Sequence, residues 1–145
     1  CNVCEEKDYR RASIIRYKPD GSDEYRYASG LRNAVGLAYH PKDDRLYASN
    51  NGRDWLGDDL PPETIYALYT EINAGWPECH AGRIIDPDYG NQDSCNSVEF
   101  PKAEIQAHSA PLGITFYTGD QFPEEYQNNI FVALHGSWNR TEPVG

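Results

Sequence analysis

Residues 35–50, VGLAYHPKDDRLYASN, contain two short apolar runs separated by a polar turn. Gly36–Tyr39 is a short apolar run that begins with glycine, Arg45–Asn50 alternates aromatic with small side chains, and the segment His-Pro-Lys-Asp-Asp lies between them. Such alternation is typical of a half-buried strand, and Pro with Asp is typical of a tight turn. The stretch therefore predicts a β-hairpin.

The same pattern recurs 77 residues later, in LGITFYTGDQFPEEYQNNIFVALHG at residues 112–136, where Gly113–Phe116 and Ile130–Leu134 are the predicted strands. Ile14–Tyr17 and Glu24–Ala28, joined by Pro-Asp-Gly, predict a further hairpin nearer the N-terminus. Recurrence of this kind is typical of a radial β-architecture. A closed propeller needs at least four blades. We therefore expect an all-β fold that is part of a larger β-propeller, with about two to three blades in this chain.

The composition limits the classes of partner. The chain has 13 basic and 23 acidic side chains and a formal charge of −10. That balance argues against nucleic acid and against an anionic membrane surface. No apolar run approaches the roughly 18 residues of a membrane-spanning helix. The chain begins at Cys1 and contains no Met, so we expect residues 1–145 to be a fragment of a longer protein.

Four cysteines allow two interpretations. Cys1 and Cys4 are followed by a glutamate where a c-type haem attachment would need a histidine. Cys79 and Cys95 lie 16 residues apart, and His80 keeps a zinc site open as an alternative. We favour disulfides Cys1–Cys4 and Cys79–Cys95, which would place the protein in an oxidising compartment.

A long loop is predicted between the two matching hairpins. Residues 75–101 are rich in Gly, Pro, Asp and Asn and carry the second cysteine pair. Loops of this length are usually functional or disordered, and a crosslink would limit the disorder.

Six segments in register carry a family resemblance: CNVCEE, SGLRNAVGLAYHP, NNGRDWLGDDLPP, NAGWPECHAG, AHSAPLGITFYTGDQFP and NNIFVALHGSWNR. With them the chain resembles the soluble pyrroloquinoline quinone (PQQ)-dependent sugar dehydrogenases, in particular the L-sorbosone dehydrogenase-like branch of the glucose/sorbosone dehydrogenase family. The resemblance implies a six-bladed β-propeller with the quinone over the central channel. It also implies oxidation of a sugar to a lactone, assisted by calcium and a general-base histidine. That histidine would lie upstream of Cys1, outside this chain.

The resemblance places Arg32 and Asn33 against the quinone. The planar fork of Arg matches a carboxylate, and Asn can donate to a carbonyl. The alternative is a surface Arg beside a turn Asn. Val35 departs from the family, whose glucose dehydrogenases carry Gln before the following glycine, so one polar contact is missing here.

The acidic loop after the first matching hairpin is the expected calcium site. The resemblance assigns the backbone carbonyls of Gly52 and Arg53 as ligands, and calcium accepts backbone carbonyls among its six to eight oxygens. Asp54, Asp58 and Asp59 would then brace the loop or remain solvated carboxylates.

Three more residues follow from the resemblance. His135 lies where the family's glucose dehydrogenases place a cofactor-contacting Lys, and Arg140 would add a second positive contact. His108 is a further candidate for the quinone, with a loop-orienting hydrogen bond as the alternative. Trp76 and Trp138 are expected either to pack or to face the sugar. Asn139 begins an N-glycosylation sequon, which has meaning only in a eukaryotic secretory setting.

The predicted function is PQQ- and calcium-dependent oxidation of an aldose or related sugar, such as glucose or sorbosone. An external electron acceptor such as a cytochrome, and a periplasmic or secreted location, follow from it. Two alternatives stay open: a non-catalytic propeller that binds carbohydrate or protein, and a calcium-dependent lactone hydrolase.

Overall fold

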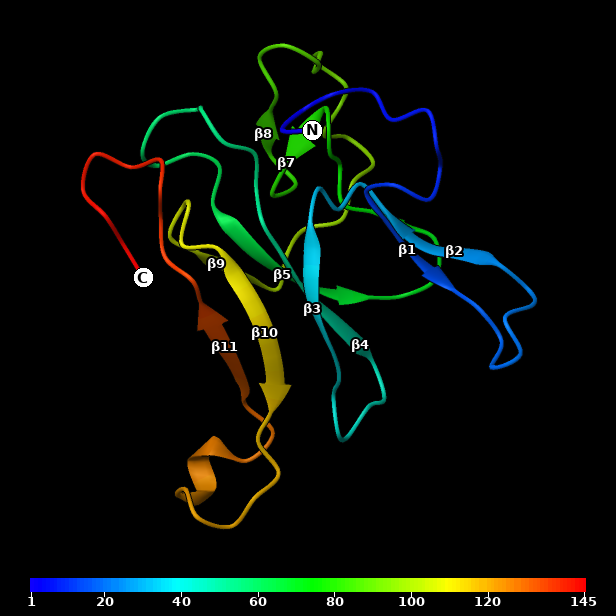
Figure 1. Cartoon of the computed structure of the whole chain (residues 1–145), viewed down its shortest axis with the longest axis vertical. Coiled ribbons are helices and arrows are strands. Elements are labelled where there is room, and N and C mark those ends of the chain that lie inside the picture. The colour runs from blue at the N-terminus through cyan, green and yellow to red at the C-terminus, as the bar shows by residue number, and fades with distance from the viewer.

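The computed structural model describes all 145 residues, and its regular structure is β-strand apart from one short 3-10 helix (Figure 1). The elements are β1 (Ser13–Arg16), β2 (Tyr25–Ser29), β3 (Ala34–Tyr39), β4 (Leu46–Asn50), β5 (Glu63–Leu68), β6 (Ile72–Asn73), β7 (Cys79–His80), β8 (Ile84–Ile85), β9 (Ala103–Ile105), β10 (Pro111–Phe116), η1 (Glu124–Tyr126) and β11 (Ile130–Leu134).

The strands form one complete four-stranded sheet and smaller partial ones. β3, β4, β5 and β9 pair in that order, all antiparallel. β1 and β2 pair as a hairpin that β6 extends in parallel, while β10 pairs with β11 and β7 with β8. One four-stranded blade with partial neighbours confirms the predicted fold class, an all-β segment of a propeller.

The three predicted hairpins are present, with boundaries shifted by at most two residues. Ile130–Leu134 is reproduced without change as β11, and Gly113–Phe116 falls inside β10. Five strands, β5 to β9, were not predicted. The longest of them, β5, follows directly from the acidic loop and is buried along its whole length. The predicted loop at residues 75–101 contains only the two-residue strands β7 and β8, joined by turns.

Hairpin β10–β11 lies against the four-stranded sheet through backbone contacts. The Ser49 hydroxyl donates to the carbonyl oxygen of Leu112 (2.6 Å) and accepts from the N–H of Gly36 (2.9 Å). A Cβ on Gly36 would overlap that same carbonyl oxygen and approach the Ile114 nitrogen to 2.9 Å. Glycine is therefore required where the two sheets meet.

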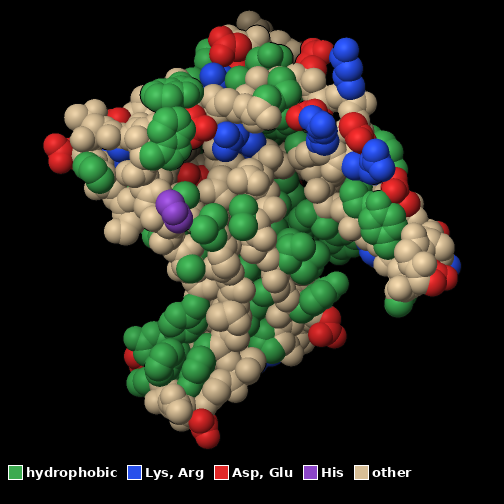
Figure 2. All heavy atoms as spheres, viewed as in Figure 1, with side chains coloured by type: hydrophobic (Ala, Val, Ile, Leu, Met, Phe, Trp, Pro, Cys, Tyr) green, Lys and Arg blue, Asp and Glu red, His purple; other side chains and the backbone are tan.

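The core is small and the surface is large. The buried cluster is Ala28, Leu31, Ala48, Tyr66, Leu68, Ile72 and Ala74. The accessible surface is 8595 Å², against roughly 7500 Å² for a compact monomer of 16.4 kDa. The excess reflects an open shape. Figure 2 shows an apolar hollow between the hairpin β1–β2 and the hairpin β3–β4. It is lined by Ile14, Ile15, Arg16, Tyr27, Leu37, Ala38, Tyr39 and Leu46.

Both predicted disulfides are present, Cys1–Cys4 and Cys79–Cys95, and no cysteine is free. A zinc site on these cysteines is therefore wrong, because their thiols are consumed in pairs. None of the helical structure in this chain is long and apolar enough to cross a bilayer.

Candidate functional site

A cavity of about 190 Å³ lies beyond the end of β4, where five segments of the chain converge. It is lined by Arg32, Asn33, Asn51, Gly52, Asp54, Glu63, His108, Ala110, Trp138 and Asn139. The structure thus brings together four of the predicted site residues: Arg32, Asn33, Gly52 and His108. The side chains of Arg53, His135 and Arg140 do not line this cavity.

Arg32 is the cation of the cavity. Its Nη1 donates to the carbonyl oxygen of Gly52 (2.5 Å), its Nη2 to Asp54 Oδ2 (3.0 Å) and its Nε to the carbonyl oxygen of Asn2 (2.8 Å). The side chain is only 16% exposed. All three nitrogens of the fork are therefore held by oxygens, and the guanidinium neutralises the Asp54 carboxylate beside the cavity.

Asn33 offers a free amide at the same wall. Its backbone is fixed, because its N–H donates to Asn50 Oδ1 (3.1 Å) and its carbonyl accepts from the N–H of Asn51 (3.1 Å). Its exposed side chain makes no hydrogen bond within the chain. A ligand in the cavity could therefore bind this amide without displacing an internal partner.

Gly52 sits where the loop presses against β5. Its N–H donates to Glu63 Oε2 (2.6 Å), and a Cβ at this position would lie 2.9 Å from Pro61 Cγ. Glu63 is 3% exposed, and burial raises the pKa of its carboxyl above the ordinary range despite the N–H groups of Gly52 and Ala110. The sequence pattern did not indicate Glu63, because Glu63 begins β5, a strand without alternation.

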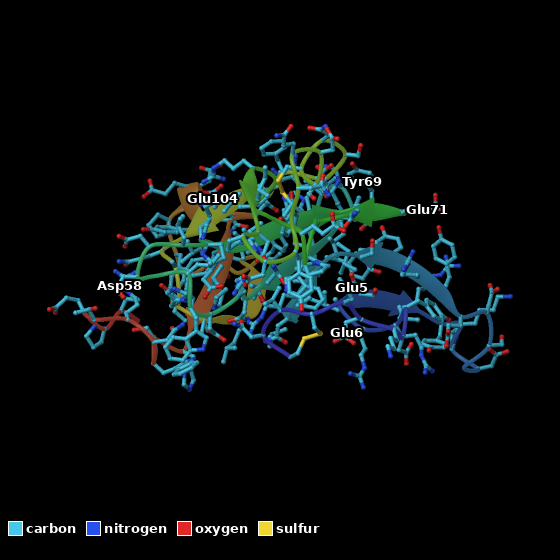
Figure 3. All side chains as sticks on the ribbon, turned by 90° about the horizontal axis from the view of Figure 1, so that it is seen from above. Glu5, Glu6, Asp58, Tyr69, Glu71 and Glu104 are labelled. Atoms are coloured by element: carbon cyan, nitrogen blue, oxygen red, sulfur yellow. A yellow bond between two sulfur atoms is a disulfide. The ribbon has the colours of Figure 1, made fainter.

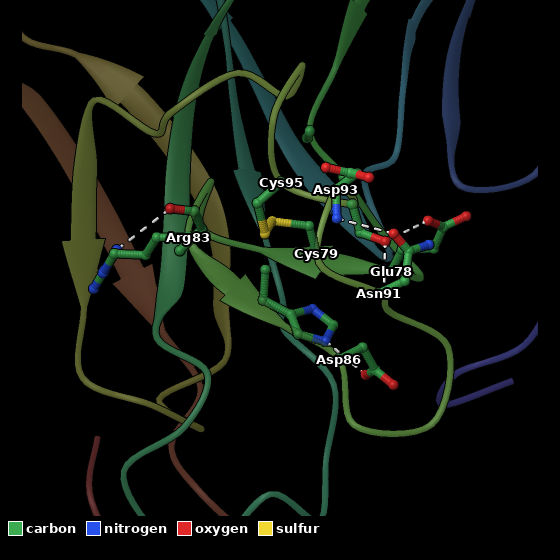
Figure 4. The surroundings of a disulfide bond; sticks show 12 residues. Glu78, Cys79, Arg83, Asp86, Asn91, Asp93 and Cys95 are labelled. Carbon is green, nitrogen blue, oxygen red and sulfur yellow. Dashed lines mark hydrogen bonds and ion pairs between the residues drawn. A yellow bond between two sulfur atoms is a disulfide. The ribbon is translucent and has the colours of Figure 1, made fainter.

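Arg53 turns its side chain away from the cavity into a buried charge cluster. Its Nη1 donates to Asp86 Oδ2 (2.5 Å), and both terminal nitrogens lie 3.2 Å from Asp88 Oδ2. Asp86 is 0% exposed and also faces His80 Nε2 at 2.8 Å, the pair marked by a dashed line in Figure 4. The predicted ligand role of Arg53 concerns only its backbone carbonyl.

Opposing effects set the protonation of this cluster. Burial lowers the pKa of His80, and the positive charges of Arg53 and Arg32 lower it further, so that the net pKa lies below the ordinary value although the Asp86 carboxylate raises it. At neutral pH the ring is therefore neutral and donates from Nε2 to Asp86. Burial raises the pKa of Asp86, but hydrogen bonds from Arg53 and His80 and from two backbone N–H groups hold the net value below the ordinary one. The cluster is one buried carboxylate shared by one cation and one neutral imidazole.

His108 is bound on both ring nitrogens. Nε2 lies 2.8 Å from the carbonyl oxygen of Gly57 and must donate to it, which leaves Nδ1 to accept from Asn139 Nδ2 at 3.3 Å. Its φ of +67° lies in the left-handed region, unusual for a residue with a side chain. In this arrangement the ring positions the acidic loop.

Arg140 and His135 lie outside the cavity in different settings. Arg140 donates to the carbonyl oxygen of Asp58, approaches Asp59 Oδ1 at 3.4 Å and is 8% exposed. His135 follows β11, is exposed and makes no side-chain hydrogen bond. Arg140 therefore binds the acidic loop, whereas the His135 ring has no hydrogen bond within the chain.

The acidic loop divides its carboxylates between two places. Asp54 lines the cavity, and Asn139 Nδ2 donates to its Oδ1 (3.2 Å). Asp58 accepts the N–H of Thr141 (3.0 Å), which lowers the pKa of its carboxyl. Figure 3 shows Asp58 at one end of the molecule, away from Glu71 and Tyr69. Asp59 is 87% exposed. A side-chain cage made of these aspartates is therefore not assembled here.

The donor set of the cavity suits a hard cation together with an anionic ligand. Gly52 contributes a carbonyl oxygen, Asp54 and Glu63 contribute carboxylates, and Asn139 Oδ1 is buried without a hydrogen-bond partner. Hard divalent cations bind such oxygens. Arg32 supplies the balancing positive charge and is the side chain best shaped for a carboxylate.

Comparison with known proteins identifies the family of this chain. The family model TrAA12-like matches residues 73–145, half of the chain. The chain belongs to the TrAA12-like family. Its curated relatives include an uncharacterised protein of Borreliella burgdorferi, 44% identical over 94% of this chain and 36% of that protein. They also include the pyrroloquinoline quinone-dependent pyranose dehydrogenase of Coprinopsis cinerea, 30% identical over 80% of this chain and 20% of that protein.

The fold of this TrAA12-like chain matches that of the quinone-binding domain of the Coprinopsis cinerea pyranose dehydrogenase. The TM-score is 0.78 over the whole of this chain and 45% of that domain, at 22% identity. The TrAA12-like chain thus spans less than half the length of the proteins it matches, from 20% to 45% of those compared. The predicted resemblance to quinone-dependent sugar dehydrogenases is confirmed at the level of the family. The narrower assignment to the sorbosone branch stays a prediction.

Proposed function

We propose that this chain forms the cofactor-facing wall of a PQQ- and calcium-dependent dehydrogenase that oxidises an aldose or related sugar, glucose- or sorbosone-like, to its lactone or acid. The observation that carries the proposal is the cavity, where a guanidinium, a free amide and a set of hard oxygen donors converge. The similarity to a pyranose dehydrogenase supports it.

Arg32 and Asn33 would bind the quinone. Arg32 holds the Gly52 carbonyl and the Asp54 carboxylate, and a carboxylate of the quinone would take over its bidentate fork. Asn33 would donate its unpartnered amide to a carbonyl oxygen. Val35, 46% exposed, adds no polar contact.

Gly52 and Arg53 would offer their backbone carbonyls to calcium. The carbonyl oxygen of Gly52 becomes available once Arg32 binds the quinone, and Asp54 lies close enough to supply a compensating charge. The buried side chain of Arg53, fixed by Asp86, restrains the backbone that presents its carbonyl. When bound at these carbonyls, calcium would supply Lewis-acid polarisation, and the quinone would supply the hydride acceptor.

We propose different roles for His135, Arg140 and His108. The ring of His135 lies outside the cavity, but it has no hydrogen bond within the chain to give up, so it would be the most readily available donor to the quinone. Arg140 and His108 would have to leave Asp58 and Gly57 to do so, and we propose that they chiefly hold the loop. No residue of this chain is assigned as the base that removes the sugar's hydroxyl proton.

A periplasmic or secreted location and an external electron acceptor such as a cytochrome belong to the same proposal. Two disulfides support the location, because disulfides persist in oxidising compartments. The formal charge of −10 favours an acceptor with a basic docking face.

The test uses the full-length protein loaded with PQQ and calcium, with dye reduction by aldoses as one measurement and quinone affinity by calorimetry as the other. Arg32→Ala should weaken quinone binding by about tenfold or more, since bonds to charged groups contribute ~1.5–3 kcal/mol. Arg32→Lys should recover only part of it. Arg26→Ala is the matched control, because Arg26 is exposed and makes no hydrogen bond or ion pair within the chain.

Unchanged quinone affinity in Arg32→Ala would remove the assignment of Arg32. Absence of both quinone binding and dye reduction would refute the proposal that the protein is a dehydrogenase. Sugar binding alone would then favour the non-catalytic propeller, and quinone-free lactone hydrolysis would favour the calcium-dependent hydrolase.

A further inference from the structure

Two tryptophans stand in solvent at the edge of the cavity. Trp55 is 66% exposed and Trp138 is 69% exposed, whereas the third tryptophan, Trp76, is 8% exposed. The rings of Trp55 and Trp138 lie with centroids 5.1 Å apart and planes at 86°. They thus support one another edge to face, while most of their apolar surface faces water.

The chain holds this pair in place through the residues next to each ring. Asp54 accepts a hydrogen bond from Asn139 Nδ2 (3.2 Å), so the immediate neighbours of the two tryptophans are bonded to each other. The N–H of Asp54 also donates to Asn2 Oδ1 (2.7 Å). The loop that carries Trp55 and the segment that carries Trp138 are therefore joined where the rings project.

Trp55 also has a strained backbone. Its φ of +70° lies in the left-handed region, which is a genuine outlier for a bulky side chain. Strain of this kind costs ~1–3 kcal/mol and concentrates at active sites and ligand clamps. Here it directs an indole into solvent, where the ring gains little burial to offset the cost. Within this chain the Trp55 ring packs edge to face only against Trp138, and a ligand with a flat apolar face would cover the remaining surface of both rings.

The position of the pair determines which part of a ligand it can meet. Trp138 lines the cavity and Trp55 does not, so the pair extends from the cavity wall outward. At about 190 Å³ the cavity is smaller than the ~300 Å³ at which sites for drug-sized ligands begin. A ligand that extends outward from the cavity along the Trp138 wall would meet the face of the tryptophan pair.

The surrounding charge selects among flat ligands. Asp54, Asp58 and Asp59 lie on the loop that carries Trp55, and the chain has a formal charge of −10. This field repels the phosphates of a nucleotide or nucleic acid. A pyranose ring is neutral, and its axial C–H bonds present a positive edge to the negative face of an indole.

We propose that Trp55 and Trp138 form a stacking subsite for the pyranose ring adjacent to the one oxidised, so that the substrate is an oligosaccharide. The position of the oxidised ring rests on the proposed function; stacking on the tryptophans does not. An oligosaccharide gains this contact and a monosaccharide lacks it.

The test measures carbohydrate binding to the full-length protein without quinone or dye, by calorimetry. The probes are glucose, cellobiose, cellotetraose, maltotetraose and xylotetraose. At least one tetraose should bind more tightly than its monosaccharide. Trp55→Ala and Trp138→Ala should each weaken that tetraose by about fivefold to tenfold and leave the monosaccharide within about twofold. Trp55→Phe, which keeps an aromatic face, should retain most of the affinity and guards against misfolding of the alanine variants.

Tyr39→Ala is the matched control, since Tyr39 is 68% exposed on β3 and does not line the cavity. The inference is overturned if no tetraose outbinds its monosaccharide, or if the alanine variants bind the tetraose as the wild type does. It is also overturned if those variants weaken only quinone binding, which would mean that the pair stacks on the cofactor. If the protein binds a tetraose through these residues but reduces no dye, the stacking subsite is supported and the proposed dehydrogenase activity is refuted.

Discussion

The loop between β4 and β5 is held at two places by aspartate–arginine pairs that differ in exposure. Arg53 meets Asp86 where the two side chains are 7% and 0% exposed. Arg140 approaches Asp59, which is 87% exposed, at 3.4 Å. Arg53 and Asp86 are shielded from water, so each charge depends on its protein partner. Asp59 is exposed, so water can take the place of Arg140 beside it. Removing one partner is therefore costly at the buried pair and nearly neutral at the exposed one.

The largest effect is expected from removing the buried carboxylate. Asp86→Ala leaves Arg53 and His80 buried without their shared partner, and breaking such a pair costs about 3–5 kcal/mol. The free energy of unfolding of the full-length protein, from urea titration, is the measurement. Asp59→Ala is the matched variant at the exposed anchor and should cause no measurable loss. Equal losses in the two variants would contradict the comparison.

The next effect concerns the disulfide that supports the buried anchor. Asp86 lies in the loop closed by Cys79–Cys95, whose cysteines are separated by 16 positions, against 3 for Cys1–Cys4. Chain entropy predicts a loss of about 3 kcal/mol when Cys79 and Cys95 are both replaced by Ala, and about 2 kcal/mol for the shorter loop. Thermal unfolding of both double variants measures the difference. A larger loss at Cys1–Cys4 would show that residues 75–101 hold Asp86 without the crosslink.

The smallest effect is a pH dependence confined to the buried anchor. His80 has an ordinary pKa of 6.5 that burial lowers in the folded state. The unfolded chain therefore binds more protons as the pH falls below about 6.5, and folding stability declines over that range. His80→Gln should flatten the decline between pH 7 and pH 5. Unfolding free energies at closely spaced pH values test this, and parallel curves for the two proteins would refute it.

The fold was largely predictable where local pattern and tertiary structure agree. The hairpins at 35–50 and 112–136 follow from alternation and turn chemistry, which act between neighbours in sequence. β5 was missed because it begins with Glu63 next to a Pro-rich, acidic loop, a context that indicates a turn. Its pattern Glu-Thr-Ile-Tyr-Ala-Leu is buried on both faces between β4 and β9 and shows no alternation.

The candidate site was predictable in part. Family motifs indicated Arg32, Asn33, Gly52 and His108, and the structure brings these four to one cavity. They did not indicate Glu63 or Asp86, because a buried carboxylate and an exposed one look alike in sequence. Nor did they show that the Arg140 side chain binds the acidic loop.

Sequence alone determined the three hairpins, the net charge and the family motifs, and it favoured the cysteine pairs that the structure contains, because each depends on residue types at short spacing. Tertiary structure alone decided which of many aspartates is desolvated, which arginine faces the cavity and which tryptophans stay in water. Those outcomes depend on contacts between segments 30 to 85 positions apart. Burial changes the energy of a charge or an indole by several kcal/mol, and burial is a property of the folded chain.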